Sequence, residues 1–400
     1  MKSTVSPAEK MRAVTAEVSG MLLERREQVQ LAAIAILAKK MFFQKGLPGA
    51  AKSLLAREFC RRITDGRYFE VLLDRQMDKA ELFGQYDIAK YDVTNVWERN
   101  VTGMLPDAEI VFLDEVFRAG PAVLNTLLMC MNERIFVNGA SRINIPLVTA
   151  FLASNSYPDP GLEAFWDRIT IRVETPYVRR AASFQELLHM QEPGEPKALI
   201  TLPEVLLGVE EAARIPLSPD TTEQMTNLWA SLNDEGIAIS PRRWRDSVAI
   251  LRASAYYRGA DYTSTDDLHL LRHVLWNSHE EVGTVTNLVF DLAPEWMKTV
   301  NLLDSALNDM QTKLDEKMSK GDSAGAGSLA FEYKAKIGAA RKQIIDLVVA
   351  GNTERTERLK ELATDYRSLD GQIYTLLDVA SAATKSALAT AWADLDAKLA

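Results

Sequence analysis

The residues with the clearest chemical meaning form one loop, Gly46-Leu47-Pro48-Gly49-Ala50-Ala51-Lys52-Ser53, which is followed by Leu54. Their order matches a phosphate-binding loop, G-x-x-x-x-G-K-[ST], except that Ala51 stands at the second glycine position. Backbone N–H groups of such a loop, and of the helix that follows it, cradle phosphate oxygens. In this pattern Lys52 reaches the outer phosphates and Ser53 ligates Mg²⁺.

Ala51 is the departure from that pattern. Glycine is favoured where the backbone needs a positive φ or passes close to a ligand. Alanine adds one methyl group and is tolerated where φ is negative, so we expect a negative φ at Ala51. The alternative is a chance match in a loop that merely starts a helix, and the rest of the chain must decide between the two.

A pair of carboxylates supplies a second part of the same chemistry. Asp114 and Glu115 follow the apolar run Ile110-Val111-Phe112-Leu113, which suits a strand buried on both faces of a parallel sheet. Acidic side chains at the carboxyl end of such a strand face the ligand crevice of an open α/β sheet. Asp114 would hold Mg²⁺ directly or through water, and Glu115 would act as base for an attacking water. The alternative is a strand followed by a solvated acidic turn.

A sheet must bring these residues together, and the pattern of residues 41–175 predicts one. Strand-like and helix-like segments alternate there, which is typical of a parallel sheet covered by helices. The expected strands are 41–45, 69–73, 109–113, 147–153 and 169–173. Residues 8–40 are expected to be helical, as are 121–132, where Pro121 opens the helix. Residues 134–139 read as a hairpin strand and its turn.

Three domains are expected along the chain. We place an α/β nucleotide-binding domain at residues 1–178, an all-helical domain at 179–294 and a three-helix antiparallel bundle at 295–400. The bundle is predicted from apolar residues spaced three and four apart, as in heptads. The glycine-rich segment 321–328 and the turn around Gly351-Asn352 are expected to separate its helices.

Composition excludes several classes of protein. The net charge of −9 argues against general nucleic-acid binding, which needs basic faces. No apolar run approaches the ~20 residues of a membrane span, and no signal-peptide core is present near the N-terminus. Cys60 and Cys130 form no disulfide framework. We therefore expect a cytoplasmic protein without a membrane segment.

Further motifs, in their order along the chain, resemble those of the AAA+ ATPases and within them the MoxR family. They are Leu113-Asp114-Glu115-Val116-Phe117-Arg118-Ala119-Gly120-Pro121, Asn132-Glu133-Arg134, Ala153-Ser154-Asn155, Ala164-Phe165-Trp166-Asp167-Arg168 and Ser240-Pro241-Arg242-Arg243-Trp244. Together with the alanine-bearing loop, they look closest to the regulatory ATPase variant A (RavA) branch. The resemblance covers residues 20–260, and its motifs are specific as a set.

The resemblance implies a role for four further residues. Asn155 matches sensor 1, which positions the hydrolytic water, and Arg168 matches the arginine finger, which reaches the neighbouring subunit's site. Arg242 matches sensor 2 on the lid, although the adjacent Arg243 could take that role. It also implies two insertions, a hairpin at 134–146 and a segment at 84–106.

From the residues alone, these assignments have alternatives. Asn155 could be a turn former, and Arg168 could form a surface ion pair with Asp167 or Glu163, which would contribute little. Arginines at a helix start are electrostatically unfavourable, which fits a phosphate-facing role for Arg242 or Arg243.

We therefore expect an α/β P-loop AAA+ core, followed by an all-α lid and a C-terminal helical bundle. The expected activity is ATP hydrolysis with ATP and Mg²⁺ bound, in a hexameric ring. By resemblance, the task is chaperone-like remodelling or cofactor insertion with a von Willebrand factor A-domain partner. One rival is a nucleotide-gated scaffold with negligible hydrolysis. The other is an AAA+ nucleic-acid motor, which Arg134 and Arg142 of the hairpin keep open.

Overall fold

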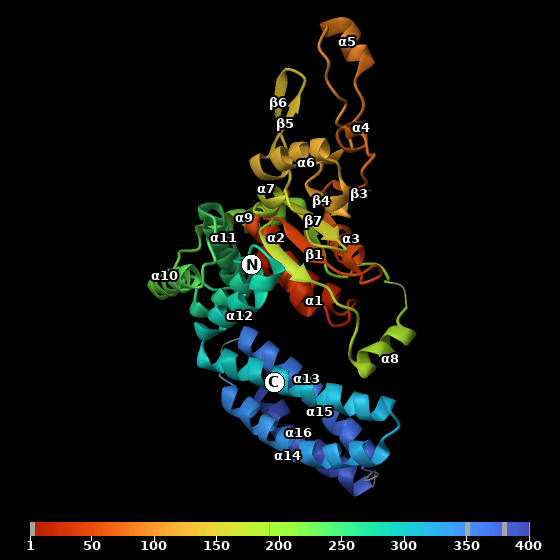
Figure 1. Cartoon of the computed structure of the whole chain (residues 1–400), viewed down its shortest axis with the longest axis vertical. Helices are drawn as coiled ribbons and strands as arrows, with labels where there is room; N and C mark the ends of the chain where they lie inside the picture. The colour runs from red at the N-terminus through yellow and green to blue at the C-terminus, as the bar shows by residue number, and fades with distance from the viewer. Residues whose placement is uncertain (1–4, 192, 349–352, 378–381, 400) are drawn as a thin grey trace. The chain divides into compact units, whose positions relative to one another are not determined.

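The computed structural model describes residues 5–191, 193–348, 353–377 and 382–399. The chain divides into two compact units (Figure 1). The first comprises Met1–Arg179 and Ser183–Leu292, and the second comprises Arg180–Ala182 and Ala293–Ala400. Among the helices described, none combines the length and apolar character needed to cross a membrane.

A parallel five-stranded sheet forms the centre of the first unit, in the order β3-β4-β7-β1-β8. The strands are β1 (Phe42–Lys45), β3 (Tyr68–Leu72), β4 (Ile110–Asp114), β7 (Thr149–Ser154) and β8 (Ile171–Glu174). Each of the five predicted strands is confirmed to within two residues. β1 lies between β7 and β8, so the loop that follows it opens at the carboxyl edge beside the ends of both strands.

Helices cover both faces of this sheet because its strands are apolar on both sides. On one face α2 packs on β1 and β8, and α3 packs on β4 and β7. On the other face the Phe43 ring lies 5.4 Å from Phe117 and 5.2 Å from Trp166, measured between centroids. The helices of this part are α1 (Pro7–Ser19), α2 (Arg26–Ala38), α3 (Lys52–Arg62), α6 (Pro121–Leu128) and α7 (Glu163–Trp166). The helix predicted at 121–132 does begin at Pro121, and it ends in a π-helical turn, Met129–Glu133.

Two insertions project from the same side of the sheet (Figure 1). One carries α4 (Lys79–Phe83) and α5 (Ile88–Thr94), and the other is the predicted hairpin, β5 (Ile135–Asn138) with β6 (Ser141–Asn144).

The two insertions contact each other closely. The Asn138 side chain accepts from the Arg99 N–H at 2.6 Å and donates to the Arg99 carbonyl at 3.0 Å. Gly139 has φ +61°, and a Cβ there would lie 2.2 Å from the carbonyl oxygen of Trp97. Glycine is therefore required at this turn by both its backbone conformation and the available space.

Further helices follow β8. They are α8 (Ala181–His189), of which the part from Ser183 belongs to the first unit, then α9 (Leu202–Arg214), α10 (Pro219–Asp234), α11 (Pro241–Arg258), the 3-10 helix η4 (Thr265–His273) and α12 (Val282–Asp291). A short parallel pair joins β2 (Ile63–Thr64), which follows α3, with β9 (Ile200–Thr201). Helix α11 packs on α2 and α9, and η4 contacts β8. The helical part is thus joined to the sheet within one compact unit.

Where the structure describes the second unit, it contains four long helices, so the prediction of three was wrong. They are α13 (Glu295–Ser319), α14 (Ser323–Leu347), α15 (Thr353–Leu376) and α16 (Ala382–Leu399). The first three bury most of the apolar residues that are spaced three and four apart, among them Leu307, Ile337 and Tyr366. Helix α16 is alanine-rich and reaches this core through few large side chains, chiefly Trp392 and Leu395, so it lacks the heptad signal that marked the others.

The segment 321–328 is also mostly helical rather than a loop. Asp322 caps α14 by accepting from the Gly325 N–H at 2.9 Å, and Ala326 is fully buried against the neighbouring helices. Small residues there allow close helix packing, which the composition alone does not distinguish from a flexible break. The predicted turn around Gly351-Asn352 lies outside the described residues.

Candidate functional site

The loop between β1 and α3 is held tightly against the end of β8. A Cβ at Gly46 would lie 2.5 Å from the carbonyl oxygen of Thr175, so only glycine fits there. The Tyr177 hydroxyl donates to the carbonyl of Pro48 at 2.8 Å. These contacts fix the loop at the carboxyl edge of the sheet, where the polar residues that follow β4 and β7 also lie.

The backbone at Ala51 contradicts the sequence expectation. Its φ is +62° and its ψ is +26°, which is the left-handed region. The expectation of a negative φ was wrong because residues with a Cβ seldom adopt this conformation, and here the loop geometry imposes it on alanine. Ala51 also precedes α3 without a side-chain cap, so no capping side chain occupies the first N–H groups of that helix.

Lys52 is the central cation of the site. It is buried, and its Nζ donates to Asn155 Oδ1 at 2.7 Å, to the Leu47 carbonyl at 3.3 Å and to the Gly46 carbonyl. Burial lowers the pKa of Lys52, and the nearby Asp114 and Glu115 carboxylates partly oppose that shift. A desolvated ammonium among carbonyl oxygens would gain from an anionic partner such as a phosphate.

The acidic residues at the end of β4, Asp114 and Glu115, lie near Lys52. Asp114 Oδ1 accepts from the Glu115 N–H at 2.9 Å, and Glu115 has φ +52°, a strained conformation of the kind found at functional sites. Asn155 Nδ2 donates to Glu115 Oε1, so Asn155 connects Lys52 with Glu115. Arg118 Nε lies 3.4 Å from Glu115 Oε2.

The donor set fits a phosphate with a divalent cation. The loop and the start of α3 provide N–H donors and Lys52, while Ser53 and Asp114, both half-buried, provide the oxygen ligands that Mg²⁺ prefers. Gly46, Pro48, Gly49 and Ala50 form the backbone of the cradle, and Gly49 adopts φ +78°.

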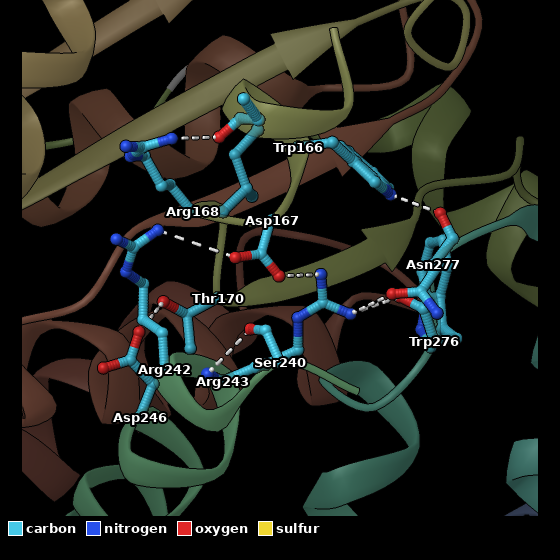
Figure 2. A network of polar contacts seen from close by, with 12 residues as sticks. Trp166, Asp167, Arg168, Thr170, Ser240, Arg242, Arg243, Asp246, Trp276 and Asn277 are labelled. Carbon is cyan, nitrogen blue, oxygen red and sulfur yellow. Dashed lines mark hydrogen bonds and ion pairs between the residues drawn. The ribbon is translucent and has the colours of Figure 1, made fainter. Parts of the chain in front are cut away.

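The predicted arginines belong to a separate polar network, beside α7 (Figure 2). Arg168 Nη1 donates to the Ala164 carbonyl at 2.6 Å. Arg242 is half exposed, with Nη1 3.6 Å from Asp167 Oδ2, whereas Arg243 is 1% exposed and lies 3.0 Å from Asp167 Oδ1. The described contacts of Arg168 and Arg242 therefore do not include the Lys52 cluster.

Sequence reasoning missed several residues around these sites. Tyr177 contacts the loop, and its place just after β8 was the available signal. Tyr157, Trp166, Trp276 and His279 line a cavity of about 300 Å³ between the loop after β7 and the segment after η4. The available signal was Trp166, a large aromatic residue next to Asp167 in the sequence. In the structure its Nε1 donates to the Asn277 carbonyl at 2.6 Å.

Comparison with known proteins identifies two family models that match this chain. Residues 9–200 match a family model described as the MoxR domain in the MoxR-vWA-beta-propeller ternary systems. Residues 220–289 match an AAA lid domain. The two matches cover the sheet with its loop, and the helices α10–α12, respectively.

Individual relatives extend over most of the chain. An uncharacterised protein of Methanocaldococcus jannaschii is 35% identical over 300 residues, which are 74% of this chain and 80% of that protein. The chaperone MoxR1 of Mycobacterium tuberculosis is 23% identical over 311 residues, 70% of this chain and 77% of the chaperone. A crystal structure of an ATPase candidate from Cytophaga hutchinsonii superposes with a TM-score of 0.59 at 18% identity, covering 72% of this chain and 94% of the other. At that identity the structural match supports the fold alone.

Proposed function

The chain belongs to the MoxR family of AAA+ ATPases, and from this premise we propose that it binds and hydrolyses Mg-ATP to remodel a protein partner. The observation that carries the proposal is the hydrogen-bonded series Lys52–Asn155–Glu115 beside the phosphate-binding loop. It puts a cation, a polar amide and a carboxylate at the place where a terminal phosphate and an attacking water would meet.

Each residue of this series has a distinct task. Lys52 and the α3 N-terminus bind the phosphates, and Ser53 with Asp114 would hold Mg²⁺, which when bound neutralises phosphate charge. Glu115 accepts a proton from the water, and Asn155 orients both that water and the Glu115 carboxylate. Lys52 must exchange its present carbonyl partners for phosphate oxygens.

The arginines are proposed to act at two different sites. Arg242 is half exposed with one weak ion pair, so it is available as sensor 2 for the phosphate of its own subunit. Arg243 is buried and its guanidinium is engaged by Trp276, Asn277 and Asp167, which makes it the poorer candidate. Arg168 is proposed as the finger for a neighbour's site, and this requires an assembly, which we propose to be a hexameric ring.

The chemistry is tested by two substitutions in the full chain. Lys52→Ala should abolish nucleotide binding, because the phosphates lose their main cationic partner. Glu115→Gln should retain binding and lose at least 10²-fold in turnover, because the water loses its base. Phosphate release and binding of a fluorescent ATP analogue measure the two effects. Wild-type turnover in Glu115→Gln would remove that residue from the mechanism.

The finger is tested by mixing subunits. Arg168→Ala should bind ATP normally and lose roughly 10³-fold or more in turnover, as expected for an arginine that stabilises transferring phosphoryl charge. Mixing it with Glu115→Gln should recover part of the activity, because some interfaces then join an intact finger to an intact base. Confirmed mixed assemblies without any recovery would contradict a role in trans.

The partners are proposed from the family. The matched model is named for systems that combine MoxR with a von Willebrand factor A domain and a β-propeller, so we propose a partner protein with the former domain. The client would be a protein remodelled or loaded with a cofactor, in the manner of a chaperone, and the distant likeness to a MoxR1 chaperone supports this. Placement in the RavA branch and in the cytoplasm remains a prediction from the sequence.

Two alternatives are less well supported. A scaffold that binds ATP without hydrolysis has no need for Glu115 and Asn155 in hydrogen-bond contact beside Lys52. A nucleic-acid motor would need a basic hairpin, yet the Arg134 guanidinium donates to the carbonyls of Lys39 and Val148. Stimulation of ATP hydrolysis by DNA or RNA would revive the second alternative.

A further inference from the structure

The turn that carries Arg168 is attached to helix α11 at both of its ends (Figure 2). Before Arg168, Asp167 Oδ1 accepts from Arg243 Nη2 at 3.0 Å. After it, the Thr170 hydroxyl donates to Asp246 Oδ2 at 3.3 Å. Arg243 and Asp246 both lie on α11, so the position of this turn is tied to the position of that helix.

The two oxygens of Asp167 have partners of unequal strength. Arg243 is 1% exposed and also donates from Nη1 to the Trp276 carbonyl at 2.9 Å and to Asn277 Oδ1 at 3.0 Å. Arg242 is 49% exposed and its Nη1 lies 3.6 Å from Asp167 Oδ2. A buried, multiply bonded pair is costly to break, whereas an exposed pair at this distance is weak.

Because its ion pair is the weaker of the two, Arg242 can move away from Asp167 without breaking the hydrogen bonds of Arg243. When Arg242 turns to another anion, Asp167 keeps Arg243 as its counter-ion and so remains a paired carboxylate. Burial lowers the pKa of Arg243, and Asp167, followed by Glu281 and Asp246, opposes that shift, so the Asp167 carboxylate contributes to compensating this buried guanidinium. The link between the turn and α11 therefore persists while Arg242 moves.

We propose that Asp167 is a positioning residue that fixes the Arg168 turn to α11 through Arg243 and holds Arg242 until a nucleotide phosphate takes it. The inference rests on the function proposed above, in which Arg168 serves the neighbouring site and Arg242 serves its own. It adds that the Asp167 carboxylate connects Arg168 with Arg242. The position of the Arg168 turn in one subunit therefore depends on the position of α11, the helix whose Arg242 contacts that subunit's own nucleotide.

The test compares turnover and nucleotide affinity in Asp167→Asn with a matched control. Asparagine keeps the size and one acceptor for Arg243 but removes the ion pairs. We expect turnover to fall at least tenfold, while ADP affinity stays within twofold of wild type. Glu204→Gln is the control, because it makes the same chemical change in the Lys10–Glu204 pair (2.5 Å), whose carboxylate is similarly exposed and lies on α9. Its turnover should stay within twofold of wild type.

A double variant separates positioning from general damage. If Asp167 acts through Arg168, then Asp167→Asn should cost nothing further in an Arg168→Ala chain, since coupled residues are non-additive. A further tenfold loss in the double variant would overturn the inference. Should Asp167→Asn unfold, Asp167→Glu replaces it: it keeps the charge beside Arg243, displaces the turn by one methylene and should lower turnover threefold or more, again only when Arg168 is present.

The possible failures are distinguishable. Wild-type turnover in Arg168→Ala would overturn the finger assignment and this inference with it. An inactive Arg168→Ala chain, combined with wild-type turnover in both Asp167→Asn and Asp167→Glu, would overturn the inference alone. Equal losses in Asp167→Asn and Glu204→Gln would reduce Asp167 to a general stabilising contact.

Discussion

Ala51 is the residue whose sequence and structure disagree most. The sequence identified it as the odd position of the loop, but its left-handed backbone could not be predicted, since alanine seldom adopts a positive φ. By contrast, Lys52, Glu115 and Asn155 were selected from residue type and position, and the structure brings their side chains into contact. That these three side chains lie together could be predicted from residue type and position, whereas the backbone strain at Ala51 depends on the tertiary contacts of the loop.

Ala51→Gly should therefore stabilise the protein, the reverse of what a negative φ would predict. Relief of the left-handed strain is worth roughly 1–2 kcal/mol, and the added entropy of the unfolded chain takes back about 0.5–1 kcal/mol. We expect a net gain of about 0.5–1 kcal/mol in the free energy of unfolding, measured by denaturant titration. The neighbouring Ala50→Gly is the control and should lose about 0.5 kcal/mol or more, because Ala50 is buried and lacks a positive φ. Loss of stability in Ala51→Gly would show that the strain is absent in solution.

At the scale of elements, strands and strongly periodic helices were predictable and irregular elements were not. The five sheet strands appeared as short apolar runs, and the heptad residues of α13–α15 are buried as expected. Helix α16 was missed because an alanine-rich helix can pack through Trp392 and Leu395 without a heptad pattern. The contact between the two insertions was also not predictable, because the asparagine that bonds both backbone groups of Arg99 has nothing in its local sequence to mark it.

Asn138→Ala should loosen that contact. Its amide is buried and bonds both the N–H and the carbonyl of Arg99, so truncation removes two hydrogen bonds and costs about 1–3 kcal/mol locally. Amide hydrogen exchange in residues 85–100 should accelerate at least tenfold, with the sheet unaffected. The control is Ser141→Ala, because its hydroxyl donates to Glu98 Oε1 at the surface, and its exchange should remain near wild type. Equal protection in both variants would mean that the insertions are held together elsewhere.

For the whole molecule, the sequence placed a domain change near residue 294, and the chain divides into compact units after Leu292. The separation of 1–178 from 179–294 is not apparent as two such units, because buried contacts join them. Arg172 of β8, for example, donates to the carbonyls of Trp166 and Trp276. Long-range packing of this kind has no signature in local sequence.

A chain ended at Leu292 should fold and bind ATP with an affinity within about threefold of the full chain, because it retains the compact unit that contains the loop. It should lose a partner or an inter-subunit contact. A chain ended at Arg258 is the control and should fail to fold, since it lacks the Trp276 carbonyl that Arg172 and Arg243 share. Nucleotide titration and light scattering compare the three chains. Loss of ATP binding in the Leu292 chain would contradict the modular interpretation.

The strand order has a consequence for how the chain is made. β1, which carries the phosphate-binding loop, pairs with β7 and β8, and Phe42 lies in register with Phe151 and Ile171. Both neighbours are synthesised long after β1, so during translation the first strand of the sheet lacks both of its strand partners. The helices of the second unit pack mainly on neighbours in sequence and need no such delay. The first unit, which is slow to assemble, therefore leaves the ribosome before the second unit, which can fold as soon as it is made. The protein is most exposed to aggregation while its sheet is incomplete.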